Sequence, residues 1–88
     1  MYGAAAMAIK FGLRRVILQK NLHRERHGQR PLTQSEIAAG IGVTQSVISK
    51  LLNAKNRRID FDTLDRLCAF FKITPAELFE YTPTPAAE

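Results

Sequence analysis

The chain has 88 residues, of which 45% are hydrophobic and 24% are charged, as is typical of one small globular domain. Its single cysteine, Cys68, excludes an intramolecular disulfide framework and fits the reducing cytosol, so we expect a cytoplasmic protein. Residues 1–58 contain eleven Lys and Arg but only two acidic residues, a net charge of +9. Residues 59–88 contain two basic and six acidic residues, a net charge of −4. This uneven distribution of charge favours a polyanionic partner for the basic part of the chain.

The first part of the chain predicts a flexible leader over residues 1–8 and then a helix from about Lys10 to His27. Gly28-Gln-Arg-Pro31 ends this helix. Its inward face is formed by Ile9, Leu13, Val16 and Ile17. Leu18 and Leu22 project from another face, either as scattered exposed residues or as part of a subunit contact. No stretch here or later alternates apolar and polar residues for long, so no strand is predicted.

Two short capped helices are predicted next. Thr33-Gln-Ser-Glu36 is a capping box, in which the threonine oxygen accepts from a helix amide and the glutamate reaches back. The helix that it opens ends at Gly42, which supplies the positive φ of a tight turn. Thr44 caps the following helix, which runs from Gln45 to about Asn53. The inward residues of the two helices are Ile37, Ala38, Ile41, Ile48, Leu51 and Leu52.

The last part of the chain predicts two more helices. The fourth begins after Asp62, with Asp65 also near its positive end. Its apolar face is formed by Leu64, Leu67, Cys68 and Phe71, which makes Cys68 a buried core thiol. The fifth opens with the capping box Thr74-Pro-Ala-Glu77. It also carries Leu78, Phe79 and Tyr81, and residues 82–88 form a flexible tail. We therefore expect an all-α fold, a compact domain of five helices over residues 9–81.

The stretch Gln34–Asn53 carries the functional signal. Two short helices joined by three or four residues must cross steeply if both bury an apolar face, and the small Ala38 and the turn residue Gly42 allow this crossing. Such packing leaves one face of the second helix exposed. The residues on that face are Thr44, Gln45, Ser46, Ser49 and Lys50, all of which form hydrogen bonds and none of which is acidic.

This pattern resembles the phage-repressor/Cro-type (XRE family, lambda-repressor-like) helix-turn-helix domain. The resemblance covers about residues 10–81, with one matching helix before the motif and two after it. It implies that Gln34 holds a backbone phosphate and steadies the recognition helix. Gln45 resembles the residue that reads a base, and its amide suits the N6 and N7 atoms of adenine.

Further roles also follow from the resemblance. The other base-reading positions are Ser46, Ser49 and Lys50, where Lys50 reaches either guanine or only a phosphate. The phosphate-binding residues are Gln34, Thr44, Asn53, Lys55, Asn56, Arg57 and Arg58, together with Arg30 in a connection that is longer than usual. The family often has glycine at the position of Ala54, so we expect the third helix to end differently, with Asn53 or Asn56 in the left-handed conformation.

These residues predict a sequence-specific regulator of transcription, most often a repressor, that binds a palindromic operator as a homodimer. The alternative is an antitoxin that neutralises a small partner toxin and regulates its own operon, and a second rival is a contact module that has lost DNA binding.

No apolar run approaches the roughly 20 residues of a membrane span. His23 and His27 lack further ligands nearby, so we expect no metal, and we expect no cofactor and no enzymatic activity.

Overall fold

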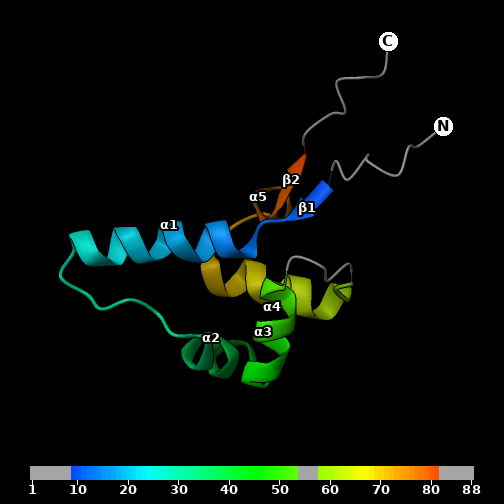
Figure 1. The fold of residues 1–88 in the computed structure, drawn as a ribbon, viewed down its shortest axis with the longest axis horizontal. Helices are drawn as coiled ribbons and strands as arrows, with labels where there is room; N and C mark the ends of the chain where they lie inside the picture. The colour runs from blue at the N-terminus through cyan, green and yellow to red at the C-terminus, as the bar shows by residue number, and fades with distance from the viewer. Residues whose placement is uncertain (1–8, 54–57, 82–88) are drawn as a thin grey trace, which may run out of the picture.

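The computed structural model describes residues 9–53 and 58–81, so the predicted leader and tail lie outside the described residues. The elements run in the order β1 (Ile9–Phe11), α1 (Leu13–Arg26), α2 (Gln34–Ile41), α3 (Gln45–Leu52), α4 (Phe61–Phe71), α5 (Pro75–Leu78) and β2 (Phe79–Tyr81). The helices surround one core, and α2 and α3 lie on one side of α1 while β1 and β2 lie on the other (Figure 1). The prediction of a compact domain with five helices is confirmed.

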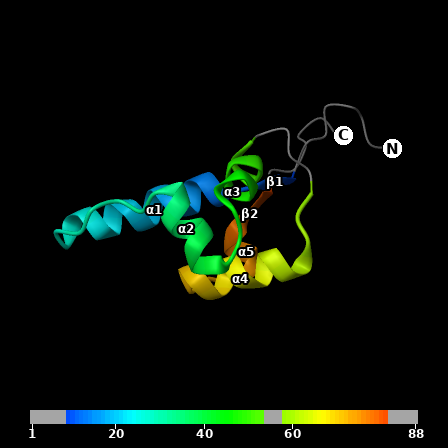
Figure 2. The same ribbon diagram turned by 90° about the horizontal axis from the view of Figure 1, so that it is seen from below.

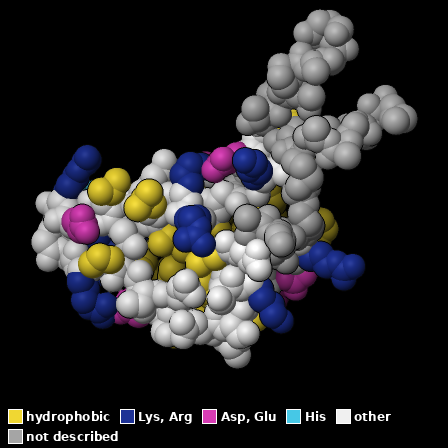
Figure 3. Space-filling model, in the orientation of Figure 1, with side chains coloured by type: hydrophobic (Ala, Val, Ile, Leu, Met, Phe, Trp, Pro, Cys, Tyr) yellow, Lys and Arg dark blue, Asp and Glu magenta, His cyan; other side chains and the backbone are white. Residues whose placement is uncertain are grey.

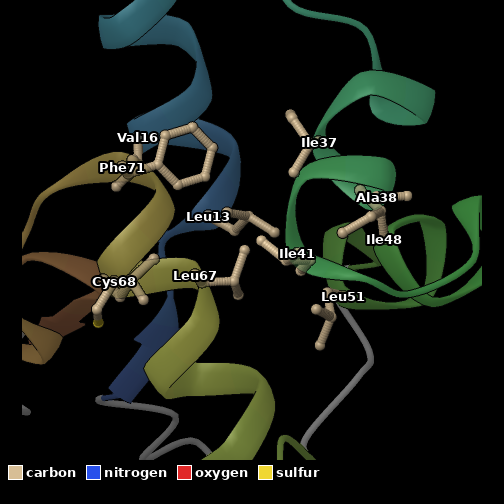
Figure 4. Close-up of a cluster of buried hydrophobic side chains, with 11 residues drawn as sticks. Leu13, Val16, Ile37, Ala38, Ile41, Ile48, Leu51, Leu67, Cys68 and Phe71 are labelled. Atoms are coloured by element: carbon tan, nitrogen blue, oxygen red, sulfur yellow. The ribbon is translucent and has the colours of Figure 1, made fainter.

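The core is built from every helix. Its largest fully buried side chains are Leu13, Ile37, Ile48, Leu67 and Leu78, one from each of the five helices. In Figure 4, side chains of α1 and α4 meet those of α2 and α3 across a shared interior. Cys68 belongs to this cluster, as predicted, and burial followed by the charges of Asp65 and Glu77 raises the pKa of its thiol. Because the helix-turn-helix shares this core with α1 and α4, these helices hold it in place.

Two short strands were not predicted from the sequence. β1 and β2 form an antiparallel ribbon in which Ile9 pairs with Tyr81 and Phe11 with Phe79. The rings of Phe11 and Phe79 lie 5.4 Å apart. The expectation that no strand forms is therefore wrong. Each strand has only three residues, too few to show an alternation of apolar and polar residues, and the two strands lie at opposite ends of the domain sequence. Consequently α1 begins at Leu13 instead of Lys10, and Phe79 and Tyr81 belong to β2 instead of α5.

The predicted caps of α2 and α3 are present, and the start of α4 is shifted. Thr33 and Glu36 form the reciprocal capping box of α2, and the Thr44 side chain accepts from the backbone N–H of Val47 in α3. α4 begins at Phe61, two residues earlier than expected, because the carboxylate of Asp60 accepts from the backbone N–H of Thr63. The α2 and α3 boundaries are set by capping groups that lie next to them in the sequence.

The C-terminal half of α1 extends beyond the other helices, as both views show (Figure 2). Leu18 and Leu22 on this helix are exposed, as predicted. The connection to α2 is tied back to α1, because Asn21 Oδ1 accepts from the backbone N–H of Leu32 at 2.8 Å and Arg24 Nε donates to the carbonyl of Arg30. None of the helices in the described part has the length and apolar character to cross a membrane.

Candidate nucleic-acid interface

The turn between α2 and α3 has the predicted backbone geometry. Gly42 ends α2 in the left-handed conformation with φ at 77°. The backbone N–H of Val43 then donates to the carbonyl of Ala38, which closes the turn. From α4, the Arg66 guanidinium donates to the carbonyl of Ile41 and pairs with Asp62 one turn away. The hydrogen bond within the turn and the contact from Arg66 of α4 therefore both stabilise the crossing of α2 and α3.

One face of α3 is buried and the opposite face is open to solvent. Ile48 is fully buried and Leu51 nearly so, and both belong to the shared core. The exposed positions on the other side and at the amino end are Thr44, Gln45, Ser46, Ser49 and Lys50. The structure therefore brings the predicted base-reading residues together on one exposed surface. We call the surface formed by these five residues the α3 face.

Ser35 in the first turn of α2 contacts the α3 face, and the sequence pattern had not singled it out. Its hydroxyl donates to Oε1 of Gln45 at 2.8 Å. Gln34, for which the resemblance implied the steadying role, is half-buried and lines a small hollow between α1, α2 and α3 together with Arg14 and Leu52. Only the crossing of α2 and α3 brings Ser35 to Gln45, ten residues apart, so no local pattern indicated the pair.

Arg30 lies near the α2 amino end but has an acidic partner. Its guanidinium binds both carboxylate oxygens of Glu36, the same carboxylate that accepts from the backbone N–H of Thr33 in the capping box. The hydrogen bond from Arg30 and then that from Thr33 lower the pKa of Glu36 from an ordinary 4.5 to about 2. Arg30 therefore stabilises the start of α2, and its contact with a phosphate stays a prediction.

The basic residues after α3 are only partly described. Lys50 and Arg58 are exposed and line one open hollow of about 630 Å³ together with Asp60. Lys55, Asn56 and Arg57, which the resemblance places on the phosphate backbone, lie outside the described residues. Figure 3 shows largely uncharged surface over α2 and α3, with Lys and Arg side chains on either side of it.

The carboxyl end of α3 differs from the expected left-handed stop. Asn53 has extended backbone, with φ at −72° and ψ at 125°, so the expectation for this residue is wrong. Arg14 of α1 donates to the carbonyl of Leu52 instead, and the backbone N–H of Asn53 donates to the carbonyl of Lys50. An arginine from a neighbouring helix thus satisfies a terminal carbonyl of α3 without a glycine.

The described residues contain no cluster of three or more His, Cys, Asp or Glu side chains that could hold a metal ion. His23 on α1 and His27, the residue that follows α1, are both exposed, with ring centroids 4.4 Å from each other. Nδ1 of His27 is hydrogen-bonded to the carbonyl of His23. This arrangement is that of a solvated helix surface.

Comparison with known proteins identifies the same module. A family model described as "Cro/C1-type HTH DNA-binding domain" matches residues 14–84, a range that contains α2 to α5 and all of α1 except its first residue. No curated protein and no solved structure matches the chain.

Proposed function

The chain belongs to the family of Cro/C1-type helix-turn-helix DNA-binding domains, and we propose that it regulates transcription by binding a specific operator in double-stranded DNA. The α3 face enters the major groove, with Gln45, Ser46, Ser49 and Lys50 at the base edges. A single observation carries this proposal. The exposed side of α3 combines hydrogen-bonding side chains with the complete absence of carboxylates, whereas its other side is anchored in the core.

Phosphate contacts are proposed to come from Thr44 of the α3 face and from residues around that face. These residues are Gln34, Thr44, Asn53, Arg30 and Arg58, together with Lys55, Asn56 and Arg57. They position the domain on the duplex and make the affinity depend on salt, and they do not themselves read sequence. We propose that the protein acts in the cytoplasm as a homodimer on a palindromic site, with half-sites about one helical turn, ~34 Å, apart. Repression by occupying such a site needs no cofactor and no catalytic group.

The proposal is tested by selecting bound sequences from random duplex DNA at near-physiological salt. The expected result is an enriched palindrome, and a lack of any enriched motif would contradict the proposal. Ser49→Glu places a carboxylate on the α3 face and should abolish enrichment. Gln19→Glu makes the same change in charge at an exposed position of α1 and should preserve it. Equal loss in both variants would indicate a general charge effect instead of groove binding.

The alternative function is that of an antitoxin, in which the domain binds DNA only to control the synthesis of a partner toxin. The exposed Leu18 and Leu22 on α1 are the feature that favours a protein partner. Co-purification of a small protein in stoichiometric amount from the native host, lost in a Leu18→Lys variant that still binds DNA, would favour this alternative.

A further inference from the structure

We propose that the outward face of α1 around Leu18 and Leu22 is the surface through which two copies of this chain associate, with their α1 helices antiparallel. This inference rests on the proposed function, in which the protein acts as a homodimer, and deepens it by naming the contact. Association is measurable without DNA, so the interface and the function are tested separately.

Leu18 and Leu22 form an apolar pair that the described part of the chain leaves uncovered. Leu18 is 62% exposed and Leu22 is 48% exposed, and residues four apart lie on the same side of a helix. The buried residues of α1, Leu13 and Val16, lie on the opposite side, where they share the core with α3. A contact through the two leucines therefore requires no change in the core and does not bury the α3 face.

The two ends of this outward face carry opposite charges. Arg14 precedes Leu18 by four residues and Glu25 follows Leu22 by three, so both charges lie on the same side of α1 as the leucines. Glu25 is exposed, and its carboxylate has no ion pair among the described residues. Arg14 is exposed as well, and its guanidinium donates to the carbonyl of Leu52 at 3.3 Å, which leaves further N–H groups for a carboxylate.

A two-fold axis midway between Leu18 and Leu22 brings the apolar and the charged parts of two copies into register. It places Leu18 of one copy against Leu22 of the second copy, and the symmetry repeats every contact. Arg14 and Glu25 are at nearly equal separations from the midpoint, so each Glu25 meets Arg14 of the other copy. Parallel helices would set like charges against each other, which is unfavourable. The charges therefore favour the antiparallel arrangement.

The charge on the other flank of the face is already compensated within each copy. Antiparallel pairing brings Arg26 of one copy toward Arg15 of the other. Nε of Arg15 donates to Oε2 of Glu80 at 2.8 Å, in an ion pair that remains partly exposed. Arg26 thus approaches a pair without net charge, in which Glu80 offers a carboxylate oxygen.

The proposed contact is small, because each copy contributes one side of a single helix. Stable interfaces bury about 800 Å² on each partner, so we expect a weak monomer–dimer equilibrium with a dissociation constant on the order of 10–100 μM. Two half-sites on one duplex raise the effective concentration of the two copies. Association should therefore be stronger on a palindromic operator than in free solution.

Sedimentation equilibrium of the full chain, over concentrations that bracket this constant, tests the role of the leucines. Leu22→Lys should weaken association by about ten- to hundred-fold, since each dimer loses two apolar contacts and gains two charges. The matched control is Phe61→Lys, because Phe61 is 87% exposed but lies on α4, and its association should equal that of the wild type. Circular dichroism shows whether each variant is folded.

An exchange of charges tests the antiparallel orientation. Glu25→Arg and Arg14→Glu should each prevent association over the same concentrations, because each places like charges together twice in the dimer. An equimolar mixture of these two variants should associate again, since every arginine then faces a glutamate. Mixing does not repair a folding defect, so this recovery requires contact between the two copies.

The outcomes separate the interface from the proposed function. A wild-type chain that stays monomeric overturns the inference, as do equal losses in Leu22→Lys and Phe61→Lys or a mixture that does not associate. A motif enriched from random duplexes in any of these cases leaves the function standing. Association as described without an enriched motif supports the interface and refutes the function. A small protein that co-purifies with a monomeric wild-type chain and is lost in Leu22→Lys assigns the face to another partner and overturns the inference.

Discussion

The ring of Phe70 in α4 covers Gly40 in α2 so closely that a Cβ atom at Gly40 would lie 2.3 Å from Cε1 and 2.8 Å from Cδ1 of the ring. The ring also packs edge to face against Phe71, with centroids 5.0 Å apart and an interplanar angle of 85°. A Cβ atom at Gly40 therefore requires the Phe70 ring to move. The ring of Phe70 thus packs directly against the backbone of α2.

Gly40→Ala should lower the free energy of unfolding by about 1–2 kcal/mol. Alanine improves helix propensity by up to about 1 kcal/mol, but forcing an extra carbon against a packed ring costs roughly 1–3 kcal/mol. Chemical denaturation measures the difference. The control is a double-variant cycle with Phe70→Ala, since without the ring Gly40→Ala should be neutral or stabilising. A destabilisation of equal size in both backgrounds would show that the ring is not the cause.

Gly42→Ala should destabilise the domain by about 1–2 kcal/mol for a different reason. A Cβ at Gly42 meets only Nη1 of Arg66 at 3.4 Å, which is an ordinary contact, but the backbone φ of 77° is unfavourable for alanine. Asparagine tolerates the left-handed conformation better, so Gly42→Asn should cost less than Gly42→Ala. If the two variants unfold at the same denaturant concentration, backbone strain is not the origin of the loss.

The capping box of α2 should make stability depend on pH in the acidic range. The folded protein lowers the pKa of Glu36 to about 2, so its stabilising contribution is complete above the ordinary value of 4.5 and is lost as the pH falls toward 2. Glu36→Gln does not titrate. The wild-type advantage over this variant, measured by denaturant unfolding, should therefore shrink between about pH 5 and pH 2. An advantage that stays constant over this range would exclude the Arg30–Glu36 pair as its source.

Lys50→Ala distinguishes the two roles that the sequence left open for Lys50. A phosphate contact predicts weaker binding to all DNA and a salt dependence reduced by about one unit, whereas a base contact predicts lost preference at one base pair. Lys10→Ala is the matched control, because Lys10 is also exposed but lies in β1, on the other side of α1 from α3. Affinities measured over a series of salt concentrations give the slope. Equal changes in the two variants would argue against a direct contact by Lys50.

The helix-turn-helix was predictable because its signals are local. The capping box at Thr33 and Glu36, the cap at Thr44 and the turn glycine Gly42 each act within four residues, and the apolar spacing of α3 assigns its two faces. The exposed positions of the α3 face follow directly from that spacing. The family match over residues 14–84 agrees with this part of the prediction.

The features that the sequence did not predict depend on contacts between distant residues. The pairing of β1 with β2, the contact of Ser35 with Gln45 and the bond from Arg14 to the Leu52 carbonyl all require the tertiary arrangement. The start of α4 was misplaced for another reason. Asp60 and Asp62 are both suitable caps, and propensity alone does not choose between them.

The β1–β2 ribbon has the geometry of a hairpin without its turn. Tyr81 at the end of β2 pairs with Ile9 at the start of β1, so the backbone leaves and enters the domain at one point. A two-residue Asn-Gly link between them would suit the twist of such a ribbon and close the backbone into a ring. New ends could then be opened beside Gly28, which is exposed and where an added Cβ atom would meet nothing within 4 Å. The domain is thus suited to circular permutation, with the α3 face left intact.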